Sequence, residues 1–153
     1  MSRKKTGIRY LDVCYNVNPS KNVVVCHLTC GINLFRLPNV DIINSLYVFD
    51  DINARIETWE DENGNAAPYI VFEVNAFAHC SPEDEFNEEI GKKLALTRAQ
   101  AKAFSIGNDF YEYIFRKIYD LLETYNRLWS NCSISYVNCL THADDIINDI
   151  DNK

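Results

Sequence analysis

Arginine and aromatic side chains are the residues of this chain whose chemistry best suits a bound ligand. Arg98 follows Phe86 and Asn87 in a segment with helical periodicity, and Arg36 and Arg55 belong to other expected elements. A guanidinium group binds phosphate through paired hydrogen bonds, and an aromatic ring stacks on a base. Together, these five residues predict a binding site for a small anionic ligand.

The segment around Ser81 favours the start of a helix, and with it an anion site. Ser81 can accept hydrogen bonds from the first amides of a helix, Pro82 has no amide to leave unsatisfied, and Asp84 has capping-box spacing to Ser81. The sequence therefore predicts a junction between sheet and helix, with the helix beginning at Pro82. Free backbone amides and the positive end of the helix dipole meet at such a junction, where a phosphate binds well.

No arrangement of nucleophile, base or metal ligands emerges from the sequence. His79 and Cys80 are adjacent on an expected strand, so their side chains point to opposite faces and form no dyad. The carboxylates of residues 83–89 suit the first turns of a helix, where they complement the dipole. The cysteines lack C-x-x-C spacing and the histidines are scattered. We therefore expect a protein that is not an enzyme, with no catalytic residues, no metal and no cofactor.

Composition and charge favour a single soluble domain. Of the 153 residues 47% are hydrophobic and 24% charged, and no apolar run approaches the roughly 20 residues that a membrane span requires. We expect one domain over residues 1–153, with a flexible acidic tail from about residue 141. The basic N-terminus is not followed by an apolar segment, which predicts a cytoplasmic protein with reduced cysteines. The net charge of −7 argues against nucleic acid as a partner.

The first half of the chain has the alternation and the turns of two β-hairpins. Residues 8–15 and 22–30 are rich in Val, Ile, Tyr and Cys, and Asn, Pro and Ser separate them. Residues 52–60 and 69–78 alternate with a period of two on either side of an Asn-Gly turn, which is a strong hairpin signal. The interrupted apolar run at residues 32–44 is compatible with a loop or a short helix.

After Pro82 the apolar period changes to that of a helix. Apolar residues recur at helical spacing up to Phe104, and a Gly-Asn-Asp sequence at residues 107–109 then predicts a break. A second helix is expected at residues 110–129, followed by a short strand or a loop at residues 131–140. The prediction for the whole chain is an α+β fold, with an antiparallel sheet of four or five strands followed by two long helices packed on one face.

Small and aromatic residues of the helical half bear on its packing. Gly91, Ala95 and Ala99 form a stripe that predicts close approach to the sheet or to another helix. Arg98 flanks this stripe, and Phe86 is open to two interpretations, as a core residue or as a stacking partner for a base. The second helix carries more apolar surface than one sheet face needs, which predicts a homo-oligomer.

The junction also carries a family resemblance. Its pattern consists of residues 80–86, Gly91, Leu94, Ala95, Arg98 and Ala99. This pattern resembles small proteins of Firmicute phages and prophages, and the element order resembles the Thoeris anti-defence family of cyclic-ADP-ribose sponges. The resemblance implies a fold and an oligomeric assembly like that family's. It also implies sequestration, in the host cell cytoplasm, of a cyclic nucleotide signal (a cyclic ADP-ribose isomer or a cyclic oligonucleotide) without hydrolysis.

Other interpretations stay open. The acidic residues 83–89 and the acidic tail suit an inhibitor that docks on a host defence protein. A sheet followed by a helix also resembles double-stranded-RNA-binding folds, although the negative charge argues against RNA. An enzyme that degrades a nucleotide is disfavoured, because no nucleophile or set of metal ligands can be assembled from the sequence.

Overall fold

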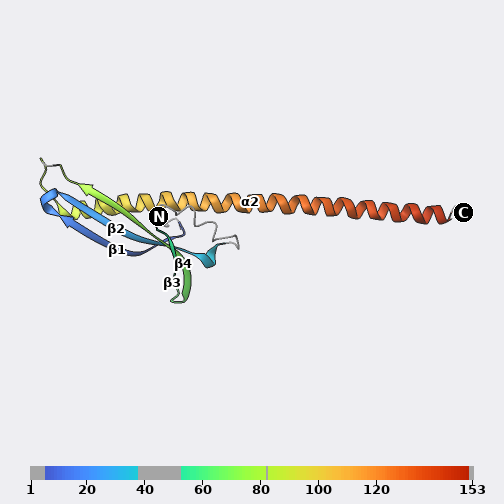
Figure 1. Ribbon diagram of the computed structural model, residues 1–153, viewed down its shortest axis with the longest axis horizontal. Coiled ribbons are helices and arrows are strands. Elements are labelled where there is room, and N and C mark those ends of the chain that lie inside the picture. Colours follow the sequence, from blue (N-terminus) through green and yellow to red (C-terminus); the bar gives the residue numbers. More distant parts are fainter. Residues whose placement is uncertain (1–5, 38–52, 82, 152–153) are drawn as a thin grey trace, which may run out of the picture. The chain divides into compact units, whose positions relative to one another are not determined.

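The computed structural model describes residues 6–37, 53–81 and 83–151, which form one antiparallel sheet and one long helix (Figure 1). The strands are β1 (Ile8–Asn18), β2 (Val23–Asn33), β3 (Arg55–Glu60) and β4 (Ala66–His79), in the spatial order β1-β2-β4-β3. Helix α2 spans Glu88–Asp151, and the short 3₁₀ helices η1 (Pro19–Lys21) and η2 (Leu34–Arg36) follow β1 and β2. The predicted α+β class and the antiparallel sheet of four strands are confirmed.

Both predicted hairpins form, and polar turn residues fix each of them. Between β1 and β2, the Asn18 side chain accepts a hydrogen bond from the Lys21 amide, and Asn22 adopts a left-handed conformation. Between β3 and β4, the Asp61 carboxylate accepts hydrogen bonds from the amides of Asn63 and Asn65. Asparagine and aspartate favour such turns because their side chains bond the nearby backbone.

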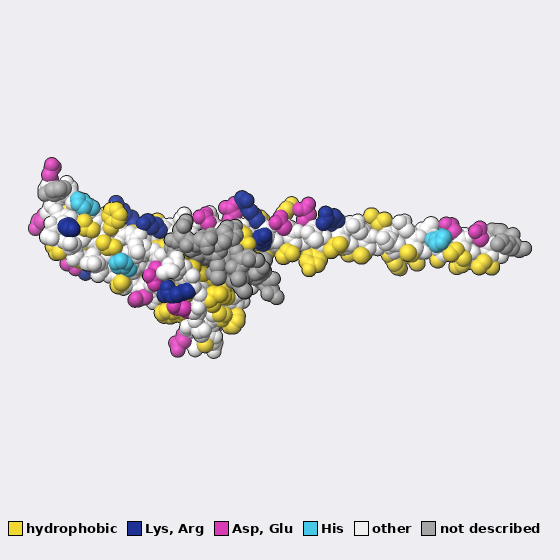
Figure 2. Space-filling model, viewed as in Figure 1, with side chains coloured by type: hydrophobic (Ala, Val, Ile, Leu, Met, Phe, Trp, Pro, Cys, Tyr) yellow, Lys and Arg dark blue, Asp and Glu magenta, His cyan; other side chains and the backbone are white. Residues whose placement is uncertain are grey.

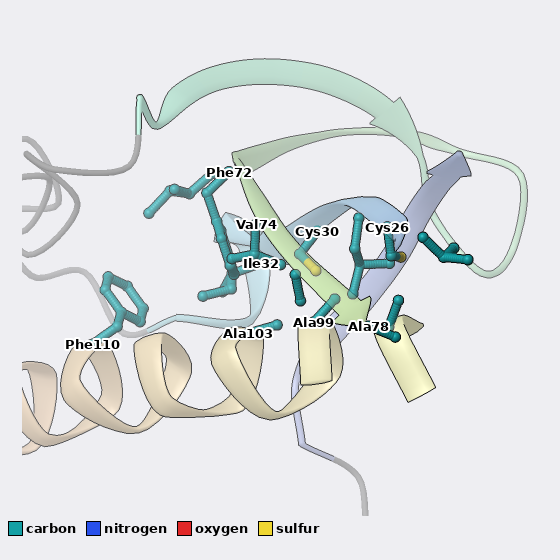
Figure 3. Packing of buried hydrophobic residues seen from close by; sticks show 14 of the residues in the cluster. Cys26, Cys30, Ile32, Phe72, Val74, Ala78, Ala99, Ala103 and Phe110 are labelled. Atoms are coloured by element: carbon teal, nitrogen blue, oxygen red, sulfur yellow. The ribbon is translucent and has the colours of Figure 1, made fainter. Parts of the chain in front are cut away.

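The hydrophobic core lies between one face of the sheet and the first part of α2 (Figure 3). From β4 it contains Ile70, Phe72, Val74, Ala76 and Ala78, which share one face as the period-two alternation of residues 69–78 predicts. From α2 it contains Ala95, Ala99, Ala103, Phe110 and Ile114. The three alanines are fully buried, so the predicted small-residue stripe brings the helix close to the sheet.

The prediction of two helices is wrong, because α2 continues through the Gly-Asn-Asp sequence at residues 107–109. Gly107 is a packing residue: a Cβ at this position would lie 2.4 Å from Ile8 Cδ1. Glycine inside a helix costs about 1 kcal/mol relative to alanine. Burial of Phe110 and Ile114 on the next turns offsets this cost, since each large buried side chain contributes about 1.5–3 kcal/mol.

The helix also begins later than predicted, at Glu88 and not at Pro82. Ser81 instead serves a turn: its side-chain oxygen accepts the Glu83 amide at 3.5 Å, and its carbonyl accepts the Asp84 amide at 3.1 Å. Asn87 is the residue that caps α2, because its side-chain oxygen accepts the Ile90 amide at 3.0 Å. An amide two or three positions after the cap is the usual partner of such a side chain.

By its internal contacts the chain divides into two units, residues 1–114 and 115–153, and α2 contributes to both. Residues 131–140, predicted as a strand or a loop, are helical. The residues from about 141, predicted as an acidic tail, also belong to α2 as far as Asp151. Many Ser, Asn, Thr and Cys residues in this stretch have weak helix propensity, which obscured the helix in the sequence.

Candidate functional site

The five predicted ligand-binding residues do not form one cluster of side chains. Arg98 is exposed on α2, while Phe86 and Asn87 lie just before the helix, and Arg55 begins β3. Arg36 ends η2, and its side chain lies outside the described part of the chain. A ligand contacted by all five is therefore not supported by the described positions.

Arg98 forms part of a different arrangement, together with Lys102 one helical turn later. Arg98 Nη1 donates a hydrogen bond to the Phe77 carbonyl at 2.9 Å. Lys102 Nζ donates one to the Asn75 carbonyl at 2.7 Å. Carbonyls two residues apart in a strand point to the same edge, so both cations lie along one edge of β4.

This edge of β4 is incompletely paired among the described strands. β3 is shorter than β4 and pairs only with the stretch from Ala66 to Val71. The remainder of β4, from Phe72 onward, pairs on its other side with β2. Lysine near an unpaired edge protects it from other strands, and Arg98 and Lys102 here satisfy two of its carbonyls. The two cations therefore have a structural role in addition to any contact with a ligand.

A groove of about 570 Å³ lies beside this edge, between β4 and α2. Its lining residues are Asn53, Glu73, Val74, Asn75, Lys102, Ser105 and Ile106. Pockets that hold small molecules span about 300–1,000 Å³ and place a few polar groups in their walls. The groove thus has the size of a small-molecule site, with amide, hydroxyl and ammonium groups along it.

Arg55 controls the charge at one margin of the groove. Arg55 Nη1 lies 3.2 Å from Glu73 Oε1, and Arg55 Nε forms a second ion pair with Glu57. Hydrogen bonds from Arg55 and then from Trp59 lower the pKa of the Glu57 carboxyl, and the bond to Glu57 is the main reason that the pKa of Arg55 is raised. Arg55 therefore balances the charge of Glu73, and its guanidinium is already paired with two carboxylates.

Phe86 and Asn87 have structural partners. Phe86 is partly buried and packs against the main core, which agrees with the core interpretation of this residue. Asn87 caps α2 through its side-chain oxygen and also accepts the Gly91 amide with its carbonyl, at 2.9 Å. The predicted anion site at the helix start thus has one of its amide donors occupied by the Asn87 side chain.

Lys102 is the cation of the groove, and the sequence analysis did not identify it. Its signal in the sequence is the spacing of four residues from Arg98, which places both cations on one side of a helix. Neither residue forms an ion pair with a carboxylate in residues 6–37, 53–81 or 83–151. The pair therefore adds positive charge that forms no ion pair with a described carboxylate, in a chain whose net charge is −7.

Other kinds of site were sought in the described part of the chain. No group of three or more His, Cys, Asp or Glu side chains in it has the arrangement of a metal site. No described helix is long and apolar enough to cross a bilayer. Comparison with known proteins returned no matching family model, no matching curated protein and no matching solved structure. The resemblance to the Thoeris anti-defence family therefore stays a prediction.

Proposed function

We propose that this protein binds a phosphate-bearing cyclic nucleotide, either a cyclic ADP-ribose isomer or a cyclic oligonucleotide, and holds it without hydrolysis. In this role it is a phage anti-defence protein that withholds an immune signal from its effector in the host cell cytoplasm. One observation carries the proposal: Lys102 lines a groove of about 570 Å³, and Arg98 lies one helical turn before it along the same edge of β4.

The chemistry of the two cations suits a phosphate. A guanidinium carries five N–H donors and an ammonium three, so one hydrogen bond to a strand carbonyl leaves several donors on each. Hydrogen bonds to a carbonyl leave the charge in place, and charge-assisted bonds to phosphate are stronger than bonds between neutral groups. The amides and the hydroxyl of Asn53, Asn75 and Ser105 supply further polar partners along the groove.

Sequestration requires affinity and no chemical step, so the proposal assigns no catalytic residue and no cofactor. Calorimetry with cyclic ADP-ribose isomers and cyclic oligonucleotides tests it directly. We expect saturable binding of at least one of them, and recovery of the unmodified ligand after the protein is denatured. Absence of binding to all of them contradicts the proposal. A chromatographic product in the recovered ligand indicates an enzyme.

A second candidate is an acidic inhibitor of a host defence protein. The exposure of every acidic side chain in residues 83–89 favours it. Carboxylate clusters steer association with a basic partner surface. Neutralising these side chains with Gln and Asn would then weaken inhibition, whereas a nucleotide sponge that binds along β4 would retain its ligand.

Self-association is part of the proposed function. Large apolar side chains are exposed throughout the second unit, where Leu122, Trp129 and Ile150 have 65–70% of their surface accessible. Monomeric proteins seldom expose apolar patches larger than a few hundred Å². We therefore expect a homo-oligomer that forms through residues 115–150.

A further inference from the structure

The exposed apolar residues of the second unit follow a heptad repeat. The first core position, a, is filled by Phe115, Leu122, Trp129, Tyr136, Ala143 and Ile150. The second, d, is filled by Ile118, Tyr125, Cys132, Cys139 and Ile146. Alternating steps of three and four residues without a polar interruption are the pattern of a coiled-coil seam. The repeat begins where the first unit ends, at residue 115.

Charged side chains of this unit avoid the seam. Arg116, Lys117 and Asp120 occupy positions b, c and f, and Asp144 and Asp145 occupy b and c. These positions face away from the a and d stripe of a helix. Figure 2 shows hydrophobic side chains gathered along one side of this part of α2. The helix is therefore amphipathic, with an exposed apolar face.

The sequence of this stretch needs a partner to be a stable helix. Ser130, Asn131, Ser133 and Asn138 are weak helix formers, each costing up to about 0.7 kcal/mol relative to alanine. Helical stability in proteins comes mainly from packing of the apolar face. Every described residue of the second unit up to Ile150 is exposed, so no part of the chain that the structure describes covers that face.

The seam is large enough for a stable interface. Phe115, Tyr125, Trp129 and Tyr136 are each 65–70% exposed. An aromatic side chain buries about 150–250 Å² when it is covered, so these four alone supply on the order of 400–600 Å². The aliphatic residues of the seam supply most of the remainder of the 800 Å² or so that a standard interface buries on each partner.

The order of large and small residues favours two copies that run in opposite directions. In an antiparallel pair each a residue lies beside a d residue of the other copy. With Trp129 beside the partner's Cys132, the other layers pair Leu122 with the partner's Cys139 and Ile118 with the partner's Ala143. The remaining layers pair Tyr125 with the partner's Tyr136 and Phe115 with the partner's Ile146. Three of these five layers join a large side chain to a small one, which helps to keep the packing density even. A parallel alignment would instead stack Trp129 on its own copy and leave Ala143 facing Ala143.

The charges near the two ends of the paired region are consistent with this alignment. The antiparallel alignment brings Arg116 level with the partner's Asp145, and Lys117 level with the partner's Asp144. These residues occupy outer positions of the repeat, so the alignment sets opposite charges at the same level along the axis but not in contact. A parallel alignment would place each aspartate level with its own copy. We infer that residues 115–150 of two copies form an antiparallel coiled coil, a conclusion that rests on the self-association proposed above and is independent of the ligand.

Disulfide trapping in the full chain tests the orientation. The background has Cys14, Cys80 and Cys132 replaced by Ser, and it keeps the buried Cys26 and Cys30. In this background Leu122→Cys should link to the partner's Cys139 and give a covalent dimer on a non-reducing gel in glutathione buffer. The background alone, and Leu122→Cys combined with Cys139→Ser, should stay monomeric on the gel. In the antiparallel pair identical cysteines at 122 or 139 lie about 25 Å apart along the axis, and a disulfide needs Cα atoms within about 7 Å.

The possible outcomes separate the hypotheses. Linkage of all three proteins indicates a parallel pair and overturns the orientation. Absence of linkage in all three overturns the proposed pairing of Leu122 with Cys139. Sedimentation equilibrium of the wild type gives the second readout: a mass at least twice the 17.7 kDa of the chain is expected, and a monomer at micromolar concentration overturns self-association itself.

A matched pair of variants locates the interface. Trp129→Asp places a charge in the seam, and Asn131→Asp places the same charge at an outer position, c, two residues away. We expect the dissociation constant of the dimer to rise at least about 100-fold for Trp129→Asp and less than about threefold for Asn131→Asp. Equal increases of the dissociation constant in the two variants would contradict an interface formed by the a and d positions. Nucleotide calorimetry on the same two variants keeps a failure of this inference distinct from a failure of the proposed ligand binding.

Discussion

Gly91 of α2 lies so close to Val24 of β2 that a Cβ at position 91 would stand 2.7 Å from Val24 Cγ2. Val24 is fully buried, so it has no space into which it can move. We expect Gly91→Ala to lower the free energy of unfolding by about 1–3 kcal/mol, although alanine favours a helix, because overpacking outweighs propensity. Urea unfolding followed by circular dichroism measures the change.

Gly107 provides the control for this prediction. Its neighbour is the terminal Cδ1 of Ile8, which is only partly buried and can turn aside. Gly107→Ala should therefore be less destabilising than Gly91→Ala. In the double variant Val24→Ala and Gly91→Ala, the two changes should be less harmful together than the sum of their separate effects. Strict additivity would contradict a direct clash between the two positions.

Arg98→Ala should weaken binding of the cyclic nucleotide by about 2–4 kcal/mol, because a charge-assisted contact with phosphate is lost. Lys102→Ala should weaken it similarly, and Arg98→Lys should restore only part, since lysine lacks the planar fork. Lys93→Ala removes an exposed cation elsewhere on α2 and should leave affinity unchanged. Calorimetry measures the ligand affinity of each variant. Unchanged affinity in both Arg98→Ala and Lys102→Ala would show that the ligand does not bind at the β4 edge.

Phe86→Ala should lower stability by about 2–3 kcal/mol, which is less than for a fully buried phenylalanine because the ring is only partly buried. Its effect on ligand affinity, measured well below the melting temperature, should be small. The melting curve and the calorimetric affinity of the same preparation separate a core role from a stacking role. A large loss of affinity with an unchanged melting temperature would favour stacking on a base.

Asn87→Ala should cost about 1 kcal/mol of stability, because the Ile90 amide loses its side-chain acceptor. Asn87→Asp keeps an acceptor and adds a negative charge at the positive end of the helix dipole, so it should be at least as stable as the wild type. Thermal unfolding of the three proteins tests this order. Equal melting temperatures for all three would mean that the cap contributes little to α2.

Cys30 makes stability fall at alkaline pH. Burial, and secondarily the neighbouring Cys26, raises the pKa of the Cys30 thiol from 9.0 to about 12. Above about pH 9 the unfolded chain loses this proton while the folded chain keeps it, so the unfolded state is favoured by roughly 1 kcal/mol per pH unit until the folded pKa is reached. The stability difference between the wild type and Cys30→Ala should therefore shrink between about pH 9 and pH 11, and a difference independent of pH would contradict this assignment.

Local patterns predicted the sheet well and the helical half less well. The alternation from Ile70 to Ala78 and the turn at Gly64 specify a hairpin without help from distant residues. The helix break predicted at Gly107 is wrong, because this glycine is required by close packing against Ile8, which is far away in the sequence. The helix start predicted at Pro82 is wrong, because Ser81 and Asn87 can both cap a helix. Only the packing of α2 selects Asn87.

The candidate site was accessible to sequence reasoning only in part. Arg98 was identified from its place beside the small-residue stripe, which the structure retains. The position of Lys102 at the β4 edge follows from its hydrogen bond to the Asn75 carbonyl. The ion pair between Arg55 and Glu73 depends on the register of β3 against β4. The first contact depends on how α2 packs on β4 and the second on strand pairing, and residue types specify neither.

The pairing of β2 with β4 in the middle of the sheet has a kinetic consequence. Each hairpin joins neighbouring strands through a tight turn, whereas β2 and β4 are separated by the whole segment from η2 to the Asp61 turn. Closing that segment carries an entropic penalty that must be met before the central contacts form, so local hairpins can appear in microseconds while the complete sheet forms more slowly. The folding rate should therefore depend on the connection between the hairpins more than on either turn.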